Sequence, residues 1–277
     1  MTEITAKKKT VVVKYGGAAM KDESLKKAVI GNVARLSDEG TEIILVHGGG
    51  PEISSLSSRL GIKTEFVDGL RVTDKDTLDV VLMVLAGKVN KELSGMICSL
   101  GKKGAGISGV DGSTLIAKKK DERLGFVGDV VSSDPSLIRL LTENGYIPVV
   151  STVARGEDGH IYNVNGDTAA AYIAGAVGAD ALILMTDAPG VLLDRDDPKT
   201  LIPELSANEA REMIRTGAAS GGMIPKLLCC VTAVGLGVPR VSVIDGKDPE
   251  ALISAVRTGK AGTRVFRDDD NDNNRDR

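Results

Sequence analysis

Short apolar runs alternate along the chain with longer stretches in which hydrophobic residues recur every three to four positions. The apolar runs predict buried strands at 11–15, 42–47, 147–153, 181–185 and 240–244. The periodic stretches predict helices at 24–38, 76–100, 137–143, 167–177, 208–215, 224–236 and 249–257. Strands that alternate with helices in this order are typical of a parallel sheet covered on both faces. We therefore predict an α/β fold, a three-layer αβα sandwich with a central, mainly parallel sheet.

The remaining segments predict turns and boundaries. Residues 104–128 are rich in turn-forming residues and predict strands joined by hairpins, and Asp158-Gly159 predicts a further hairpin turn. No Pro-rich linker divides the chain, so an N-terminal lobe (1–178) and a C-terminal lobe (179–266) would meet without a long tether. Residues 267–277 are almost all charged or Asn, which predicts a disordered tail.

The composition excludes several classes of function. Hydrophobic residues make up 42 % of the 277 positions, but aromatic residues only 3 %, so the aromatic platforms of single-strand nucleic-acid binders are absent. The formal net charge of −3 gives no broad attraction to DNA or anionic lipid. No apolar run reaches the length of a membrane span, and the first residues carry no signal-peptide pattern. We expect a cytoplasmic protein that binds neither nucleic acid nor membranes.

The cysteines and histidines form no metal-ligand or hydrolase pattern. Cys98 stands alone, and Cys229 and Cys230 are adjacent in an apolar helical stretch, which predicts buried, reduced thiols. His47 and His160 are the two histidines, too few for a His-rich metal site. We therefore expect no metal ion held by protein ligands alone.

Two glycine motifs are rejected as nucleotide fingerprints. Residues 104–109 spell GxGxxG, but a turn and a predicted strand follow, whereas a dinucleotide fingerprint must open a helix. Residues 95–103 (GMICSLGKK) have the wrong glycine spacing for a phosphate loop, and Lys103 stands where Ser or Thr should bind magnesium.

Two other glycine clusters follow predicted strands and are better placed to bind phosphate. Lys14 ends the first strand and is followed, after one residue, by Gly16 and Gly17. Residues 47–51 (HGGGP) end the second strand, and the proline favours the first turn of a helix. Free backbone N–H groups at such strand ends can cradle phosphate in one cleft. Tight turns without a ligand are the alternative.

Four polar residues suggest ligand contacts, each beside a plainer interpretation. Arg71 in a predicted turn suits bidentate capture of a carboxylate, or else forms a surface salt bridge. Asn163 and Asp167 precede and open a helix, where Asp167 could serve purely as an N-cap. Lys226 lies in the first turn of a helix, against the helix dipole, which suggests a nearby carboxylate or an anionic ligand.

Taken together, these motifs resemble a known family. The segments VVVKYGG, LVHGGGP, DGLRVTD, LAGKVNK, YNVNGD, LILMTDAPGV and GGMIPK are similar, in order and spacing, to those of N-acetylglutamate kinases, which have the amino-acid kinase fold. The resemblance covers residues 10–266. It implies ATP-dependent phosphorylation of the side-chain carboxylate of N-acetyl-L-glutamate to N-acetylglutamyl 5-phosphate, the second step of arginine biosynthesis.

The resemblance also implies roles for individual residues. Lys14 and Lys226 would flank the transferring phosphoryl group, with Asp167 between them as organiser. The N-terminal lobe would bind the acyl amino acid and form the dimer, and the C-terminal lobe would bind the nucleotide. The substrate-binding residues would be Gly49, Gly50, Arg71 and Asn163. The phosphate- and nucleotide-binding residues would be Gly16, Gly17, Gly48, Thr186, Asp187, Gly190, Val191, Ala218 and Ser220.

The implied chemistry is consistent with the residues present. A side-chain carboxylate, with a reference pKa of about 4.3, is already ionised at neutral pH and needs no general base. Lysines, glycine N–H groups and magnesium would spread the charge of the transition state. ATP would bring Mg²⁺ held mainly by its own phosphates, because the motifs contain no cage of carboxylates.

The chain also departs from the arginine-inhibited members of this family. About ten residues precede the first strand, and residues 248–266 lack the family's histidine and Glu-Gly step. We therefore predict a homodimer with weak or absent arginine feedback. The alternatives are a kinase of another N-blocked amino acid, such as aminoadipate in lysine synthesis, and a non-catalytic ligand sensor on the same fold. A nitrogen-signalling partner protein is left open.

Overall fold

The computed structural model describes residues 8–20, 22–194, 196–219 and 221–268. Most of the predicted disordered tail, residues 269–277, lies outside this part of the chain. Within it, no helix is long and apolar enough to cross a membrane.

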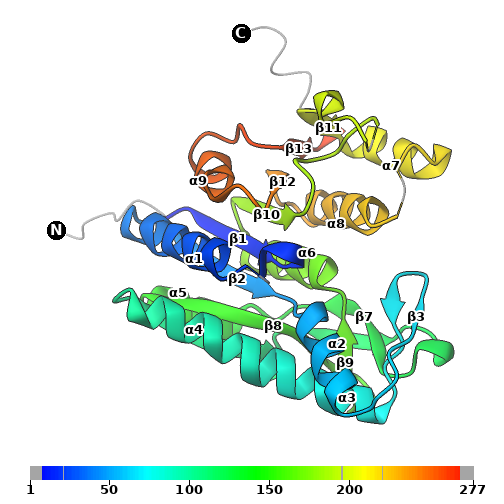
Figure 1. Ribbon diagram of the computed structural model, residues 1–277. Helices are drawn as coiled ribbons and strands as arrows, with labels where there is room; N and C mark the ends of the chain where they lie inside the picture. Colours follow the sequence, from blue (N-terminus) through cyan, green and yellow to red (C-terminus); the bar gives the residue numbers. More distant parts are fainter. Residues whose placement is uncertain (1–7, 21, 195, 220, 269–277) are drawn as a thin grey trace, which may run out of the picture.

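A mixed sheet of eleven strands forms the centre of the protein (Figure 1). The strands follow the order β11-β13-β12-β10-β1-β2-β8-β6-β7-β9, and β5 also pairs with β8. The pairings between β1, β2, β5, β8, β10 and β12 are parallel, whereas β12–β13, β6–β7 and β8–β9 are antiparallel. Their bounds are β1 Thr10–Tyr15, β2 Glu42–His47, β5 Lys103–Gly109, β6 Ile116–Lys119, β7 Val127–Ser132, β8 Tyr146–Gly156, β9 Ile161–Val164, β10 Ala181–Thr186, β11 Glu204–Ser206, β12 Val241–Asp245 and β13 Thr263–Phe266.

Helices cover both faces of this sheet, which confirms the predicted α/β sandwich (Figure 1). The α-helices are α1 Glu23–Asp38, α2 Gly50–Arg59, α3 Lys75–Leu82, α4 Asn90–Ser99, α5 Ser136–Glu143, α6 Gly166–Val177, α7 Ala207–Thr216, α8 Met223–Gly235 and α9 Pro249–Arg257. Short 3₁₀ turns are η1 Gly17–Met20, η3 Asp111–Ser113, η4 Glu122–Leu124 and η5 Pro198–Thr200. A small hairpin of β3 Phe66–Val67 and β4 Leu70–Arg71 lies apart from the sheet.

The helix predicted at 76–100 is present but is not a regular α-helix. Between α3 and α4 the chain forms a π-helix, η2, at Met83–Val89. Such a segment carries an extra residue per turn and is often found at functional sites. The periodic pattern could not reveal it, because apolar residues continue on the inner face throughout.

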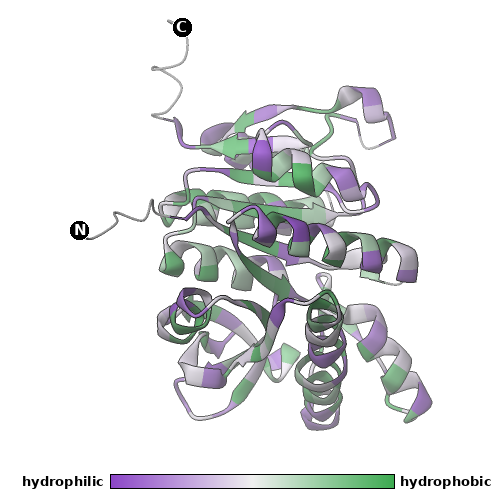
Figure 2. Cartoon of the chain, turned by 90° about the vertical axis from the view of Figure 1, so that its left-hand side faces the viewer, coloured by the Kyte–Doolittle hydropathy of each residue, from purple (hydrophilic) through white to green (hydrophobic). Residues whose placement is uncertain are grey.

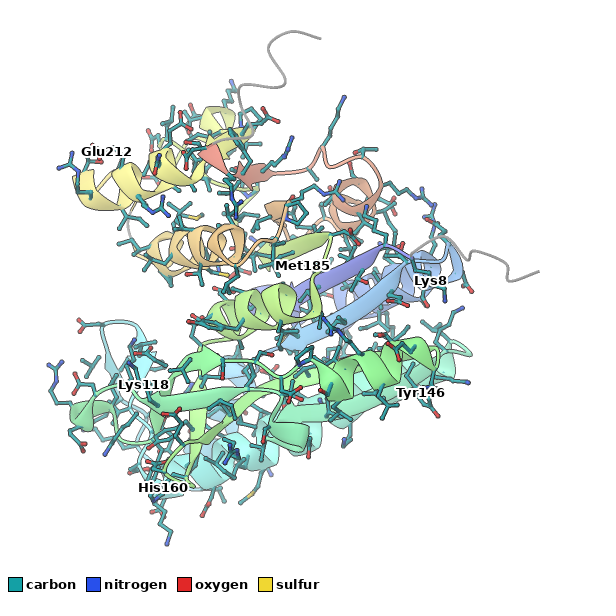
Figure 3. All side chains as sticks on the ribbon, turned by 180° about the vertical axis from the view of Figure 1, so that it is seen from behind. Lys8, Lys118, Tyr146, His160, Met185 and Glu212 are labelled. Atoms are coloured by element: carbon teal, nitrogen blue, oxygen red, sulfur yellow. The ribbon has the colours of Figure 1, made fainter. Side chains whose placement is uncertain are left out.

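The core lies in two layers, one on each face of the sheet. Apolar side chains of α1, α9, η2 and α4 pack on one face, and those of α5, α6 and α8 on the other. Figure 2 shows the corresponding concentration of hydrophobic residues on the central strands. In Figure 3, α6 and α8 lie side by side over the sheet, near the labelled Met185 of β10.

The predictions for the turn-rich segment 104–128 and for the turn at Asp158-Gly159 differ in outcome. The hairpin at Asp158-Gly159 is confirmed, since β8 and β9 pair antiparallel on either side of it. Of the strands predicted within 104–128, β6 and β7 pair antiparallel as predicted, whereas β5 pairs parallel to β8 and forms no hairpin with β6. The GxGxxG sequence lies within β5 and opens no helix, as expected from its rejection.

Candidate active site

The carboxyl ends of neighbouring parallel strands bring the glycine clusters together. In β1, Lys14 is paired with Val46 of β2 on one side and with Leu184 of β10 on the other. Gly16 and Gly17 therefore emerge at the same edge of the sheet as the 48–50 loop after β2 and the segment after β10. Ligand sites of open α/β sheets form at this edge.

Lys14, Asp167 and Lys226 meet there, as predicted. The Lys14 Nζ lies 2.9 Å from Asp167 Oδ1, and the Lys226 Nζ lies 3.1 Å from Asp167 Oδ2. These residues come from β1, α6 and α8, so their assembly depends on the packing of both helices on the sheet. The carboxylate holds two ammonium groups in one place, where they would otherwise repel each other.

Burial and charge act in opposite directions on Asp167, which is only 5 % exposed. Burial alone would raise the pKa of its carboxyl group, but the Lys14 and Lys226 ammonium groups outweigh burial and lower the pKa to about 2. Asp167 is therefore ionised at neutral pH. The interpretation of Asp167 as a simple N-cap is wrong, because Asn165 caps α6 by accepting from the backbone N–H groups of Asp167 and Thr168.

A pocket of about 210 Å³ opens on one side of this cluster. Each residue predicted to bind substrate lines it, together with Gly48 and with Gly166 beside Asp167. The relevant lining residues are Gly48, Gly49, Gly50, Arg71, Asn163 and Gly166. We call this space the acyl pocket.

Arg71 forms part of the wall of the acyl pocket and is 8 % exposed. Its Nη2 donates to the Gly50 carbonyl oxygen (3.0 Å) and to Ser54 Oγ (2.8 Å), and its guanidinium lies over the Phe66 ring. Burial lowers the pKa of Arg71 from its usual high value, which leaves it a cation. The alternative of a surface salt bridge is wrong, since no carboxylate among the described residues pairs with it.

A second pocket, of about 550 Å³, opens on the other side, and we call it the nucleotide pocket. Gly16, Gly17 and Gly48 are not among its lining residues, but five other described residues predicted to bind phosphate or nucleotide line it, together with one catalytic candidate. They are Thr186, Asp187, Gly190, Val191, Ala218 and the catalytic candidate Lys226. Ser220 lies outside the described residues.

Gly16 and Gly17 lie close to the side chains of Lys14 and Asp187, respectively. A Cβ on Gly16 would stand 3.0 Å from Lys14 Nζ, and one on Gly17 would stand 2.8 Å from Asp187 Oδ1. Gly17 also has a φ of 77°, in the left-handed region that favours glycine. Gly17 therefore needs glycine, whereas a Cβ on Gly16 would press only on the movable end of the Lys14 side chain.

Sequence reasoning missed His47 and Asn90, which support the 48–50 loop from behind. His47 is fully buried, and its ring contacts the Gly48 carbonyl and the Asn90 amide. The one available signal was the LAGKVNK segment, which places Asn90 directly after the π-helix. Among the described residues, no group of three or more His, Cys, Asp or Glu side chains is arranged to hold a metal ion.

Comparisons with known proteins agree with this geometry. The model of the amino acid kinase family matches residues 9–245. The acetylglutamate kinase of Nostoc sp. is 51 % identical over 251 residues, covering 90 % of this chain and 84 % of that one. The acetylglutamate kinase of Heliobacterium modesticaldum is 47 % identical over 272 residues, covering 94 % and 92 %.

Among solved structures, the fold is similar to that of an N-acetylglutamate synthase from Neisseria gonorrhoeae. The TM-score is 0.79 at 24 % identity, over 94 % of this chain and 60 % of that one. The extent of the sequence match and the shared fold lead to one conclusion. The chain belongs to the amino acid kinase family, in the branch represented by its acetylglutamate kinase relatives.

Proposed function

We propose that the protein transfers the γ-phosphoryl group of ATP to the side-chain carboxylate of N-acetyl-L-glutamate, in the second step of arginine biosynthesis. The single observation that carries the proposal is that two pockets open on either side of one buried carboxylate that pairs with two lysines. Relatives that are about half identical over most of the chain are named acetylglutamate kinases, which supports the choice of substrate.

The acyl amino acid would occupy the acyl pocket. Arg71 offers a buried guanidinium for its α-carboxylate, and the Asn163 side chain offers an amide for polar groups of the substrate. The Asn163 amide already donates to Thr73 Oγ1 (3.2 Å), which limits its rotation. These contacts would direct the side-chain carboxylate toward Gly49 and Lys14.

ATP would occupy the nucleotide pocket, with its base against the segment 186–193 and its phosphates toward Lys226 and the glycines. The carboxylate oxygen of the acyl substrate would attack the γ-phosphorus as the bond to the β,γ-bridging oxygen breaks, which releases ADP. Lys14 and Lys226 would neutralise charge on the attacking and leaving sides, and Asp167 would hold both in position. Backbone N–H groups of Gly16, Gly17 and Gly49 would contact the phosphate oxygens, whereas the predicted contact of Gly48 is not available to its N–H, which donates to the Tyr15 carbonyl oxygen (3.3 Å).

Magnesium fits this site as a companion of the nucleotide. Lys14 and Lys226 already occupy both oxygens of Asp167, so that carboxylate is poorly placed to bind a cation. Phosphate oxygens and water would therefore hold Mg²⁺, and it would supply further neutralisation of phosphate charge.

The wider organisation is part of the proposal. The boundary between the acyl-binding and nucleotide-binding lobes would fall at Gly178, the left-handed residue that ends α6. We propose a cytoplasmic homodimer with weak or absent arginine feedback. Sedimentation that shows a hexamer, or tight inhibition by arginine, would overturn this part.

The test is ATP turnover with N-acetyl-L-glutamate, with the acyl phosphate trapped by hydroxylamine. Free glutamate, N-acetyl-aminoadipate and UMP are assayed in parallel, and Lys226→Ala serves as the inactive control. Hydroxamate that forms chiefly from N-acetylglutamate and disappears in the variant supports the proposal. No turnover with any of the four compounds would refute the proposal. A preference for N-acetyl-aminoadipate would identify that compound as the substrate instead.

A further inference from the structure

The LAGKVNK segment is the one motif of the sequence that neither pocket fully explains. It spans residues 85–91, across the π-helix η2 and the start of α4. Its Leu85 contributes to the acyl pocket, but Asn90 is fully buried behind the loop that follows β2. What Asn90 contacts indicates what the segment does.

The Asn90 side chain ties three strands together. Its Nδ2 lies within hydrogen-bond distance of the carbonyl oxygens of Val149 (2.8 Å) and Ile107 (3.0 Å), and of His47 Nε2 (3.2 Å). Two carbonyl oxygens at one atom fix that atom as the amide nitrogen, because an amide oxygen there would have no donor. This amide nitrogen cannot accept a hydrogen bond, so a proton on His47 Nε2 would have no acceptor there, and Nε2 is the unprotonated ring nitrogen.

The other ring nitrogen of His47 then carries the proton. Nδ1 lies 2.9 Å from the Gly48 carbonyl oxygen, which can only accept, so Nδ1–H donates to it. Burial lowers the pKa of His47 to about 4, although the bond to Gly48 opposes the change. The ring is therefore neutral at physiological pH, in a single tautomer set by Asn90.

The hydrogen bond from His47 to the Gly48 carbonyl also constrains the orientation of the whole Gly48–Gly49 peptide. A peptide unit is planar, and its C=O and N–H groups point in opposite directions. When the Gly48 carbonyl is held toward the buried imidazole, the N–H of Gly49 is directed away from the imidazole, and both glycines line the acyl pocket. Glycine at these positions would otherwise let this peptide rotate easily.

The π-helix restrains the same loop from a second side. A Cβ on Gly49 would stand 2.7 Å from Leu85 Cδ2 and 3.4 Å from Val89 Cγ2, so both side chains pack directly against the Gly49 backbone. Gly49 also caps α2, where its carbonyl accepts from the Ile53 N–H. Within and directly after the π-helix, Leu85 and Val89 therefore face this loop, while Asn90 faces His47.

We propose that His47 is a positioning residue that orients the Gly48–Gly49 peptide, so that the Gly49 N–H donates to the transferring phosphoryl group, and that Asn90 fixes the required tautomer. The inference rests on the proposed function, since it concerns the same transfer step. Wild-type turnover tests the proposed function alone, and the variants below test the positioning role separately.

The sharpest test compares His47→Asn with His47→Gln. An Asn amide nitrogen can take the place of Nδ1 and donate to Gly48, whereas a Gln amide reaches the place of Nε2 instead. We expect His47→Asn to keep kcat within about threefold and His47→Gln to lower kcat by roughly 10- to 100-fold, less than the loss of an entire oxyanion donor. The KM for ATP should change little in either variant, because the contact forms chiefly in the transition state.

Ser151→Ala is the matched control for a buried polar change. Ser151 is paired with His47 across β2 and β8, is fully buried and makes no side-chain hydrogen bond. Its kcat should stay at the wild-type level. Equal kcat values for His47→Asn and His47→Gln, at similar melting temperatures, would overturn the positioning role in favour of a purely structural one.

The tautomer gives a readout that does not depend on turnover or on the folding of a His47 variant. With ¹⁵N-labelled histidine, the wild-type protein should show His47 as a neutral ring protonated at Nδ1, and His160→Gln identifies its signals. Asn90→Ala should produce a mixture of tautomers together with a lower kcat. An Nε2-protonated His47 in the wild-type protein would refute the proposal directly.

Discussion

The thiol of Cys229 donates a hydrogen bond to the backbone carbonyl oxygen of Asp167, across 2.9 Å. Burial raises the pKa of the Cys229 thiol well above its usual value, so the donor hydrogen is retained. This contact joins the first turn of α6 to α8, the two helices that carry Asp167 and Lys226.

Replacement of Cys229 should therefore affect catalysis as well as stability. We expect Cys229→Ala to lower the free energy of unfolding by about 1–2 kcal/mol and kcat by about tenfold, because Asp167 loses part of its support. Cys230→Ala is the matched control, since Cys230 is also fully buried but the hydrogen bond to the Asp167 carbonyl comes from Cys229. It should cost similar stability and leave kcat unchanged. Equal kcat losses in both variants would contradict the idea.

Lys226 should contribute mainly to the transition state. We expect Lys226→Met to lower kcat by roughly 10²–10³ with smaller changes in KM, because in the proposed mechanism the ammonium group would neutralise charge that develops during transfer. Steady-state kinetics with both substrates varied would measure the effect. Lys260→Met, which changes an exposed lysine, should have no effect on kcat. A Lys226→Met enzyme with normal kcat would remove Lys226 from the proposed mechanism.

Arg71 should contribute to the binding of N-acetylglutamate but not to the binding of ATP. Arg71 contacts Gly50 and Ser54 through its guanidinium fork and would also bind a ligand carboxylate with it, which Lys cannot reproduce. We expect Arg71→Lys to raise the KM for N-acetylglutamate by about 10- to 100-fold while the KM for ATP stays within about twofold. Exposed Arg123→Lys is the control. A selective rise in the KM for ATP would contradict the placement of Arg71 in the acyl pocket.

The stability of the protein should depend on pH in two separate windows. Burial lowers the pKa of His47 from 6.5 to about 4, so its contribution is complete above pH 6.5 and is lost as pH falls toward 4. The pKa of Asp167 is lowered from 3.8 to about 2, against the effect of burial, by its two lysines. Its contribution is complete above pH 4 and is lost as pH falls through 2. At 1.36 kcal/mol per pKa unit, the two losses are about 3 and about 2 kcal/mol.

Chemical denaturation of matched variants would measure these windows. The stability difference between wild type and His47→Asn should shrink between pH 7 and 4. The difference for Asp167→Asn should stay constant from pH 7 to 5 and begin to shrink below pH 4. A difference for His47→Asn that is flat across pH 7 to 4 would show that the imidazole is not buried in its neutral form.

Gly17 should not tolerate a side chain. Its left-handed φ and the nearby Asp187 carboxylate make Gly17→Ala strained, by about 1–2 kcal/mol for the backbone alone. We expect lower stability and a higher KM for ATP, because Asp187 lines the nucleotide pocket. Gly31→Ala is the control: Gly31 lies within α1 with open space around it, so alanine should stabilise the helix by roughly 0.5–1 kcal/mol. Thermal unfolding and ATP titration would separate the two outcomes.

The sequence predicted the elements whose pattern is local. Long apolar runs such as 42–47 and long periodic stretches such as 24–38 carry their own signal, and Asp22 and Asp248 cap helices close to the predicted starts. The β3–β4 hairpin was missed, because strands of two residues have no periodicity. The π-helix was missed for the opposite reason, since its apolar pattern matches that of an α-helix.

The candidate site also contains some residues that the sequence could predict and others that it could not. Glycines and lysines at strand ends could be found from sequence, and the lysine placed against the dipole of α8 correctly indicated a nearby carboxylate, Asp167. The roles of His47 and Asn90 could not, because their contact joins residues from β2 and α4 through hydrogen bonds that leave no local pattern. The sequence alone cannot distinguish a histidine that is buried and neutral from one that is catalytic.

The place of β1 at the centre of the sheet also constrains how the chain is made. This strand leaves the ribosome long before β10, which begins only at Ala181 and pairs with one of its two edges. Until then the nascent chain carries a long apolar strand with an open edge, a form prone to aggregate. A fragment that ends at Gly178 would keep that edge permanently. We expect such a fragment to need chaperones or a supplied β10 peptide to remain in solution.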